Sequence, residues 1–192
     1  MTYYTMSELQ AAARGMTASR AQESLRIASN TGETSFDVFL SHSLSDARAI
    51  LGLRNLLTEQ GMRVYVDWLD DPELDRSHVS PVTADRLRRR MQQSNSLIYA
   101  TSRASRKSRW MPWELGYFDG IRAGSRVSIL PVEDGSGPAI DGEEYLGLYK
   151  VIEKVRSNGR LRPYAVHPSR RRAEPLSSFT QGQGRFVDLV ME

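Results

Sequence analysis

From Phe36 onward, short apolar runs alternate with amphipathic stretches along the chain. The apolar runs predict strands at 36–41, 62–68, 96–102, 126–132 and 148–155. Between them, apolar residues recur at helical spacing, which predicts helices from Ser45 to Gly61, over 83–94 and from Trp110 to Arg122. Strands that alternate with helices of about 10–15 residues are typical of a parallel sheet with helices on both faces. The sequence therefore predicts an α/β fold.

The two ends of the chain do not follow this pattern. Residues 1–34 are rich in Ala, Ser, Arg and Gln, and their apolar spacing predicts one or two short helices and a linker. After Ser157 the pattern weakens: 161–166 is predicted to be a further strand or an edge, and Ser177 to Gly184 to be irregular. We therefore divide the chain into an N-terminal helical extension with linker (1–34), an α/β domain (35–157) and a C-terminal extension (158–192), whose packing on the domain stays open.

Composition excludes several classes of protein. The 192 residues contain no cysteine, which excludes disulfides, a thiolate nucleophile and cysteine-ligated metals, and fits a reducing compartment. The 26 basic residues face 23 acidic ones, a balance that argues against nucleic-acid binding, and the Arg triplets at 88–90 and 170–172 are interpreted as solvated. No apolar run reaches the roughly 20 residues of a membrane span, and the start lacks the layout of a signal peptide. We expect a cytoplasmic protein that binds neither nucleic acid nor membrane.

Common catalytic and cofactor-binding motifs are also missing. The sequence has no G-x-G-x-x-G after its first strand, no P-loop, no H-E-x-x-H and no G-x-S-x-G elbow. Its three histidines are scattered, so a histidine-based metal site is not expected.

Polar and aromatic residues collect instead where the predicted strands end. Because ligands of open α/β sheets bind outside the carboxyl ends of the strands, these residues are predicted to share one edge and to form a small-molecule site. The group comprises Ser41, His42, Ser43, Asp67, Trp68, Thr101, Ser102, Ser108, Trp110, Trp113 and Glu114.

Each of these residues also has a purely structural interpretation. Glu114 lies near the first turn of its helix, where the helix dipole favours an acidic residue of any role. His42 could bond only a loop backbone, and Asp67 could cap a turn. Trp110, four residues before Glu114 and on the same helix face, is either a core residue or a stacking surface for a flat ligand ring.

Two segments resemble motifs of the Toll/interleukin receptor (TIR) domains, most closely those of the bacterial stand-alone type. Phe36 to Ser43 (FDVFLSHS) resembles the first box of the family. Ser108 to Leu115 (SRWMPWEL) is similar to its S-x-W-x-x-x-E-L segment, and the acidic loop 69–81 matches the family's BB loop. The resemblance covers roughly residues 35–155. It implies a flavodoxin-like sheet of five parallel strands in the order 2-1-3-4-5.

The resemblance also implies a function. Similar bacterial members cleave NAD+ at the nicotinamide–ribose bond to give nicotinamide and ADP-ribose or a cyclic ADP-ribose signal, without a metal or further cofactor. Glu114 matches the catalytic glutamate of the family. Residues expected to bind substrate are Ser41, His42, Ser43, Asp67, Ser102, Ser108 and Trp110.

The expected partners also follow from the resemblance. They are NAD+, further copies of the chain through the loop Leu69 to Pro81, and a separate effector protein that responds to the product, as in bacterial antiviral defence. The alternative is a non-catalytic TIR module that recruits other TIR domains. The sequence leaves open whether the product is linear or cyclic.

Overall fold

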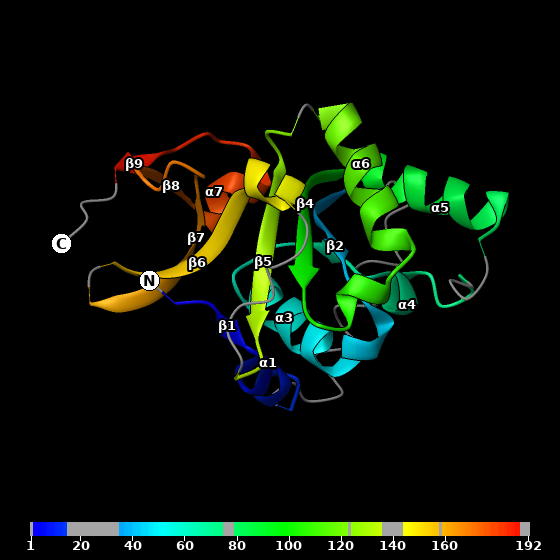
Figure 1. Ribbon diagram of the computed structural model, residues 1–192, viewed down its shortest axis with the longest axis horizontal. Helices are drawn as coiled ribbons and strands as arrows, with labels where there is room; N and C mark the ends of the chain where they lie inside the picture. Colours follow the sequence, from blue (N-terminus) through cyan, green and yellow to red (C-terminus); the bar gives the residue numbers. More distant parts are fainter. Residues whose placement is uncertain are drawn as a thin grey trace.

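A parallel sheet forms the centre of the protein, in a computed structural model that describes residues 2–14, 35–74, 79–122, 124–135, 144–157 and 159–188 (Figure 1). Its parallel strands are β2 (Phe36–Ser41), β3 (Val64–Tyr65), β4 (Ser94–Thr101), β5 (Val127–Glu133) and β6 (Lys150–Ser157). They lie in the order β3-β2-β4-β5-β6, and every neighbouring pair in this series is parallel. The α/β class with a parallel central sheet is confirmed.

Helices cover both faces of this sheet, because its strands are apolar on both sides. The helices that connect the strands are α3 (Ala47–Glu59), α4 (Asp67–Asp70), α5 (Pro81–Gln92) and α6 (Trp110–Arg122), with the 3₁₀ turns η1 (Leu44–Asp46), η2 (Ser105–Lys107) and η3 (Glu144–Leu148). Val38 and Leu40 of β2 pack in one core with Leu53 of α3. Phe39, on the opposite side of the same strand, packs in a second core with Leu115 of α6.

The prediction of a second strand over 62–68 is wrong for its last residues, which begin a helix. Strand β3 has only two residues, and Asp67 begins the short helix α4. The carboxylate of Asp70 accepts a hydrogen bond from the backbone N–H of Val66 at 2.6 Å, and the amides of Leu69 and Asp70 bond the Val66 carbonyl. This side chain gives the backbone a local alternative to the strand ladder. Asp67 and Trp68 therefore lie on a helical turn just past the strand.

The N-terminal segment is part of the domain core. Strand β1 (Tyr4–Thr5) pairs in parallel with the end of β5, and α1 (Met6–Ala12) follows it directly. The Thr5 hydroxyl caps α1 by accepting a bond from the Glu8 amide at 3.2 Å, and Leu9 is fully buried. The predicted helical extension thus contains a strand as well as a helix. The linker predicted before Ser35 lies outside the described residues.

The C-terminal extension continues the same sheet. Strands β7 (Arg160–Val166), β8 (Arg172–Pro175) and β9 (Val187–Asp188) add to β6 in antiparallel order, on the far side of the molecule from α5 and α6 (Figure 1). The segment predicted to be irregular contains helix α7 (Leu176–Gln181), so that prediction is wrong. The guanidinium of Arg126 donates to the carbonyls of Phe179 and Gly182 at 3.2 and 3.4 Å, which satisfies acceptors at the end of α7. None of the helices over these described ranges is long and apolar enough to cross a membrane.

Gly52 marks the contact between α1 and α3 and provides a test of it. A Cβ atom at this position would lie 1.8 Å from the carbonyl oxygen of Leu9. We expect Gly52→Ala to lower the free energy of unfolding by about 1–3 kcal/mol, the usual cost of overpacking. Thermal unfolding followed by circular dichroism measures the effect.

Gly116 in α6 is the matched control, because a Cβ there meets no atom within 4 Å. Alanine is the better helix former by about 1 kcal/mol, so Gly116→Ala should keep or raise the melting temperature. Equal melting temperatures for the two variants would contradict the packing of α1 on α3.

Candidate functional site

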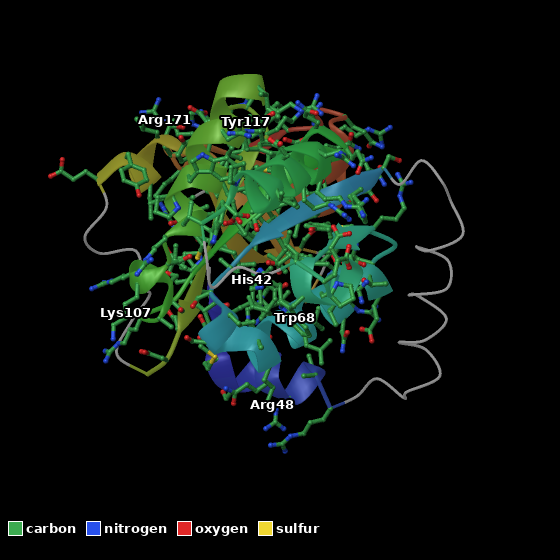
Figure 2. All side chains as sticks on the ribbon, turned by 90° about the vertical axis from the view of Figure 1, so that its right-hand side faces the viewer. His42, Arg48, Trp68, Lys107, Tyr117 and Arg171 are labelled. Carbon is green, nitrogen blue, oxygen red and sulfur yellow. The ribbon has the colours of Figure 1, made fainter. Side chains whose placement is uncertain are left out.

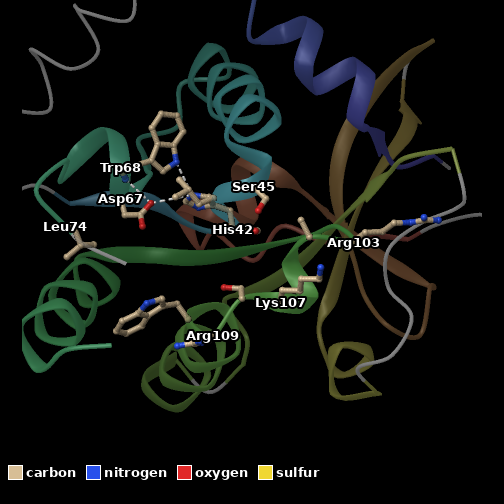
Figure 3. Close-up of a pocket in the computed structure, with 13 residues that line it drawn as sticks. His42, Ser45, Asp67, Trp68, Leu74, Arg103, Lys107 and Arg109 are labelled. Atoms are coloured by element: carbon tan, nitrogen blue, oxygen red, sulfur yellow. Dashed lines mark hydrogen bonds and ion pairs between the residues drawn. The ribbon is translucent and has the colours of Figure 1, made fainter. Parts of the chain in front are cut away.

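A cavity of about 700 Å³ opens at the carboxyl edge of the sheet (Figure 3). This volume is within the range of small-molecule sites. Its walls come from the end of β2 with η1, from α4 and the residues after it, from the loop after β4, and from the start of α6. The lining residues are His42, Ser43, Leu44, Ser45, Asp67, Trp68, Leu74, Arg103, Ala104, Lys107, Ser108, Arg109 and Trp110.

His42 lines this cavity in a defined tautomer, although only 1% of its surface is exposed. The indole N–H of Trp68 lies 3.0 Å from Nε2 of His42, and the two side chains are adjacent in Figure 2. An indole N–H can only donate, so Nε2 accepts and Nδ1 carries the proton, which it donates to the carbonyl of Leu40 at 2.8 Å. Asp67 Oδ1 lies 3.4 Å from Nε2, an ion pair that requires protonated His42 and displacement of the indole bond. His42 thus bonds the backbone, as its structural interpretation requires, and it also lines the cavity.

Glu114 and Ser41 form a buried pair beside the cavity. The hydroxyl of Ser41 donates to Oε2 of Glu114 at 2.6 Å, and both residues are 0% exposed. Neither residue lines the cavity. Trp110, one turn earlier on the same face of α6, does line it, so Glu114 lies one turn deeper. Ser41 is therefore a hydrogen-bond partner of the glutamate and not part of the cavity wall.

Ser102 and Ser108 both serve as local caps. The Ser102 hydroxyl accepts from the amides of Ala104 and Ser105 at 3.1 and 3.0 Å, and donates to Asp46 Oδ2 at 2.5 Å. Ser102 is buried and does not line the cavity. The Ser108 hydroxyl accepts from the Met111 amide at 3.3 Å at the start of α6, and Ser108 does line the cavity.

Trp110 is both a core residue and a residue of the cavity wall. It is 6% exposed and packs edge-on against Trp113, with ring centroids 5.4 Å apart, inside the core that contains α6. Its remaining surface belongs to the cavity. Loss of this ring therefore affects both packing and any ligand in the cavity.

The structure brings together most of the predicted residues and adds others that sequence reasoning missed. His42, Ser43, Asp67, Ser108 and Trp110 line the cavity, whereas Ser41, Ser102 and Glu114 lie behind its wall. The charged lining residues that were missed are Arg103, Lys107 and Arg109. Their position directly after a predicted strand was the signal that could have found them. Among the described residues, no group of three or more His, Asp or Glu side chains is placed to hold a metal ion.

The acidic loop after α4 uses its first two carboxylates inside the molecule. Asp70 pairs with Arg54 at 3.3 Å, and burial raises its pKa despite this pair. Asp71 is 2% exposed and accepts bonds from both Arg90 and the Tyr65 hydroxyl. Asp70 and Asp71 therefore do not offer free carboxylates for the self-association expected through this loop. Residues 75–78 of the loop Leu69 to Pro81 lie outside the described residues.

Asp71 holds the start of this loop to α5, and its ionisation gives a pH test. Burial alone would raise the pKa of Asp71, but the hydrogen bonds from Arg90 and Tyr65 and the charges of Arg90 and Arg86 outweigh it and lower the pKa. The stabilisation is complete above the unfolded pKa of about 3.9 and is lost as the pH falls through the lower folded value. At pH 7, Asp71→Asn should cost about 1.5–3 kcal/mol of unfolding free energy. Urea unfolding at a series of pH values should show this difference shrinking below about pH 4.

Asp85→Asn is the control, because it removes an exposed carboxylate that pairs with Arg88 at 2.7 Å one helical turn away. Exposed pairs contribute about 0–1 kcal/mol, so this variant should lose little stability. If Asp71→Asn lost no more than the control, the anchoring role of Asp71 would be refuted.

Comparison with known proteins found relatives of similar sequence. No family model matches it. It is 55% identical, over 120 residues, to a protein of Bacillus cereus (strain MSX-D12) named as a probable 3' cyclic ADP-D-ribose synthase, ThsB', a match over 62% of this chain and 61% of that protein. A protein of Cytobacillus dafuensis that carries the provisional name cyclic ADP-D-ribose synthase TIR2 is 33% identical over 48% of this chain and 25% of its own length. The match thus spans about three fifths of the first relative. Together with the two segments that carry the resemblance and the parallel sheet, these matches support a Toll/interleukin receptor (TIR) domain of the bacterial stand-alone type.

Proposed function

We propose that this protein cleaves NAD+ at the nicotinamide–ribose bond and closes the ADP-ribose part into a cyclic nucleotide. The observation that carries the proposal is the buried carboxylate of Glu114, held by Ser41 behind an open cavity at the carboxyl edge of the sheet. The names of the relatives support the choice of substrate and product, since both describe cyclic ADP-D-ribose synthases.

The proposed reaction needs one carboxylate and no general acid. The bond between the anomeric carbon and the pyridinium nitrogen breaks, and both electrons go to the nitrogen, so nicotinamide leaves as a neutral molecule. The ribose is left with a positive charge, which an ionised Glu114 stabilises. A nucleophile of the same ADP-ribose molecule then attacks the anomeric carbon and releases a proton, which gives a cyclic product. Attack by water instead gives linear ADP-ribose.

The charges around the cavity suit such a substrate. The nicotinamide ring of NAD+ is a cation, and Asp67 supplies a carboxylate to the same wall as His42 and Trp68. Trp110 offers an aromatic surface on which a flat ring can stack. We assign the nicotinamide riboside half of the substrate to this part of the cavity, next to the buried Glu114.

One observation favours the alternative of a non-catalytic interaction module. Glu114 is 0% exposed and does not line the cavity, so its carboxylate does not meet a ligand in this arrangement. Catalysis therefore requires a rearrangement that opens a path past Trp110 or pivots the Ser41–Glu114 pair toward the cavity. The two functions are separated by direct measurement of nicotinamide release.

A cyclic product would act away from the site that makes it. We therefore place its receptor on a separate effector protein, and the resemblance described above points to antiviral defence as the context. Self-association through the loop Leu69 to Pro81 stays a prediction, and the carboxylates of Asp70 and Asp71 are already paired with Arg54 and Arg90 inside the molecule.

We expect Glu114→Gln to keep the fold and to lower nicotinamide release from NAD+ by at least about 10²–10³-fold. The amide has nearly the same shape as the carboxylate but no charge, and loss of one electrostatic stabiliser typically costs this factor. Chromatography of the reaction mixture measures nicotinamide together with the linear and cyclic products.

Glu174→Gln is a matched control at the other side of the sheet. Glu174 is also buried and also accepts a serine hydroxyl bond, from Ser178 at 3.0 Å, but it pairs with Lys150. Its variant should lose some stability and keep turnover at a temperature where it is folded. If the Glu114→Gln variant releases nicotinamide as fast as the wild-type protein, the catalytic role of Glu114 is refuted. If the wild-type protein releases no nicotinamide, the interaction module is favoured.

A further inference from the structure

The loop after β4 forms a basic wall of the cavity. Arg103, Lys107 and Arg109 line the cavity, and Figure 3 shows them on the side away from Trp68. Arg106 belongs to the same loop and is exposed, but it does not line the cavity. Three of the four cationic side chains of this loop therefore line the cavity.

Hydrogen bonds fix the backbone from which these cations project. The Ser102 hydroxyl accepts from two amides of the turn, and the Ser105 hydroxyl donates to the Ser102 carbonyl at 2.7 Å and accepts from the Ser102 amide at 3.0 Å. Ser102 also donates to Asp46, which joins the turn to η1 at the facing wall. The polar contacts of Ser102 thus set the positions of the loop residues, and this is the function of a serine that does not reach the cavity. Preorganised supports of this kind are what a binding site requires.

The cations of this wall differ in how far they are neutralised. Arg103 pairs with Asp134 at 2.9 Å. Over the described ranges, the side chains of Lys107 and Arg109 make no ion pair or hydrogen bond. Two unneutralised cations facing one cavity favour an anionic ligand group, and Arg and Lys are the side chains that most often bind phosphate oxygens.

We propose that Lys107 and Arg109, assisted by Arg103, bind the diphosphate of a dinucleotide whose nicotinamide end lies against Asp67 and Trp110. This assignment rests on the proposed function, because it takes NAD+ as the ligand. NAD+ has a cationic ring at one end and a dianionic diphosphate further along, and the cavity has a carboxylate on one wall and cations on the opposite wall. The two charge patterns match in only one orientation, so the basic wall also selects the direction in which the substrate enters.

The test uses ADP-ribose as the probe, because it keeps the diphosphate and lacks nicotinamide. Isothermal titration calorimetry should show binding to the wild-type protein that weakens as salt is raised, since exposed charges are screened. Loss of one charge-assisted contact typically costs about tenfold to a hundredfold in affinity. We expect this change for Lys107→Gln and for Arg109→Gln, and a larger one for the double variant. Arg106→Gln is the matched control and should leave the dissociation constant unchanged within about twofold.

A second probe, adenosine, lacks phosphate and separates recognition of the diphosphate from damage to the cavity. The inference is supported if the variants weaken ADP-ribose binding and leave adenosine binding unchanged. It is overturned if ADP-ribose does not bind, if the control weakens binding as much as the variants, or if adenosine and ADP-ribose lose affinity equally.

These outcomes are independent of turnover. Selective loss of ADP-ribose binding in a protein that releases no nicotinamide would support the diphosphate site and refute the proposed enzyme. Nicotinamide release with an unchanged KM for NAD+ in the double variant would support the enzyme and refute the diphosphate site.

Discussion

The rest of the structure depends on the burial of strand β2 on both of its faces. All six residues of the strand are buried, with Val38 and Leu40 in one core and Phe39 in the other. A parallel strand of this kind is stable only if apolar cover is provided on each side. That requirement explains why the N-terminal helix α1 and the C-terminal helix α7 both pack in the core that lies over α3. The ends of the described chain are thus structural parts of the domain.

The same constraint shapes the chemistry at the end of the strand. Ser41 and His42 follow directly on the buried residues and are themselves almost fully buried, so their polar atoms need partners inside the protein. The Ser41 hydroxyl bonds Glu114, and the His42 ring bonds the Leu40 carbonyl and the Trp68 indole. The polar groups of the site are therefore oriented by the same burial that stabilises the sheet. Two further anchors fix the surrounding loops: Asp71 bonds α5 through Arg90, and Ser102 bonds Asp46.

Sequence reasoning predicted those features that depend on local periodicity. Strand β2 and helix α6 match the segments 36–41 and 110–122, because the spacing of their apolar residues follows the period of each element. The prediction from sequence failed where a single polar contact determines the backbone conformation. Residues 67–70 form a helical turn because Asp70 bonds the Val66 amide, and α7 is a six-residue helix whose end is satisfied by the distant Arg126. Such contacts leave no periodic signal in the sequence.

The sequence predicted where the cavity lies, but it did not predict the contacts of the individual residues. The rule that ligands bind at strand ends correctly placed His42, Asp67 and Trp110 around one cavity. It could not tell that Ser41 and Ser102 do not line the cavity, since that depends on which neighbour each hydroxyl bonds. The basic loop was visible in the sequence, but only the structure distinguishes Lys107 and Arg109, which line the cavity, from Arg106, which does not.

Two buried glutamates show why location, more than local bonding, determines what such a group can do. Glu114 and Glu174 are both nearly inaccessible, and each accepts a hydrogen bond from a serine hydroxyl. Glu174 pairs with Lys150 where the antiparallel strands extend the sheet, and it does not line the cavity. Glu114 lies at the carboxyl edge, one turn behind Trp110 and the cavity. The low dielectric around Glu114 makes its charge costly to bury, and it also strengthens the attraction between that charge and any positive charge that develops nearby. In the proposed reaction, the positive ribose gains from this attraction once the Ser41–Glu114 pair has turned toward the cavity and the bound nucleotide excludes water.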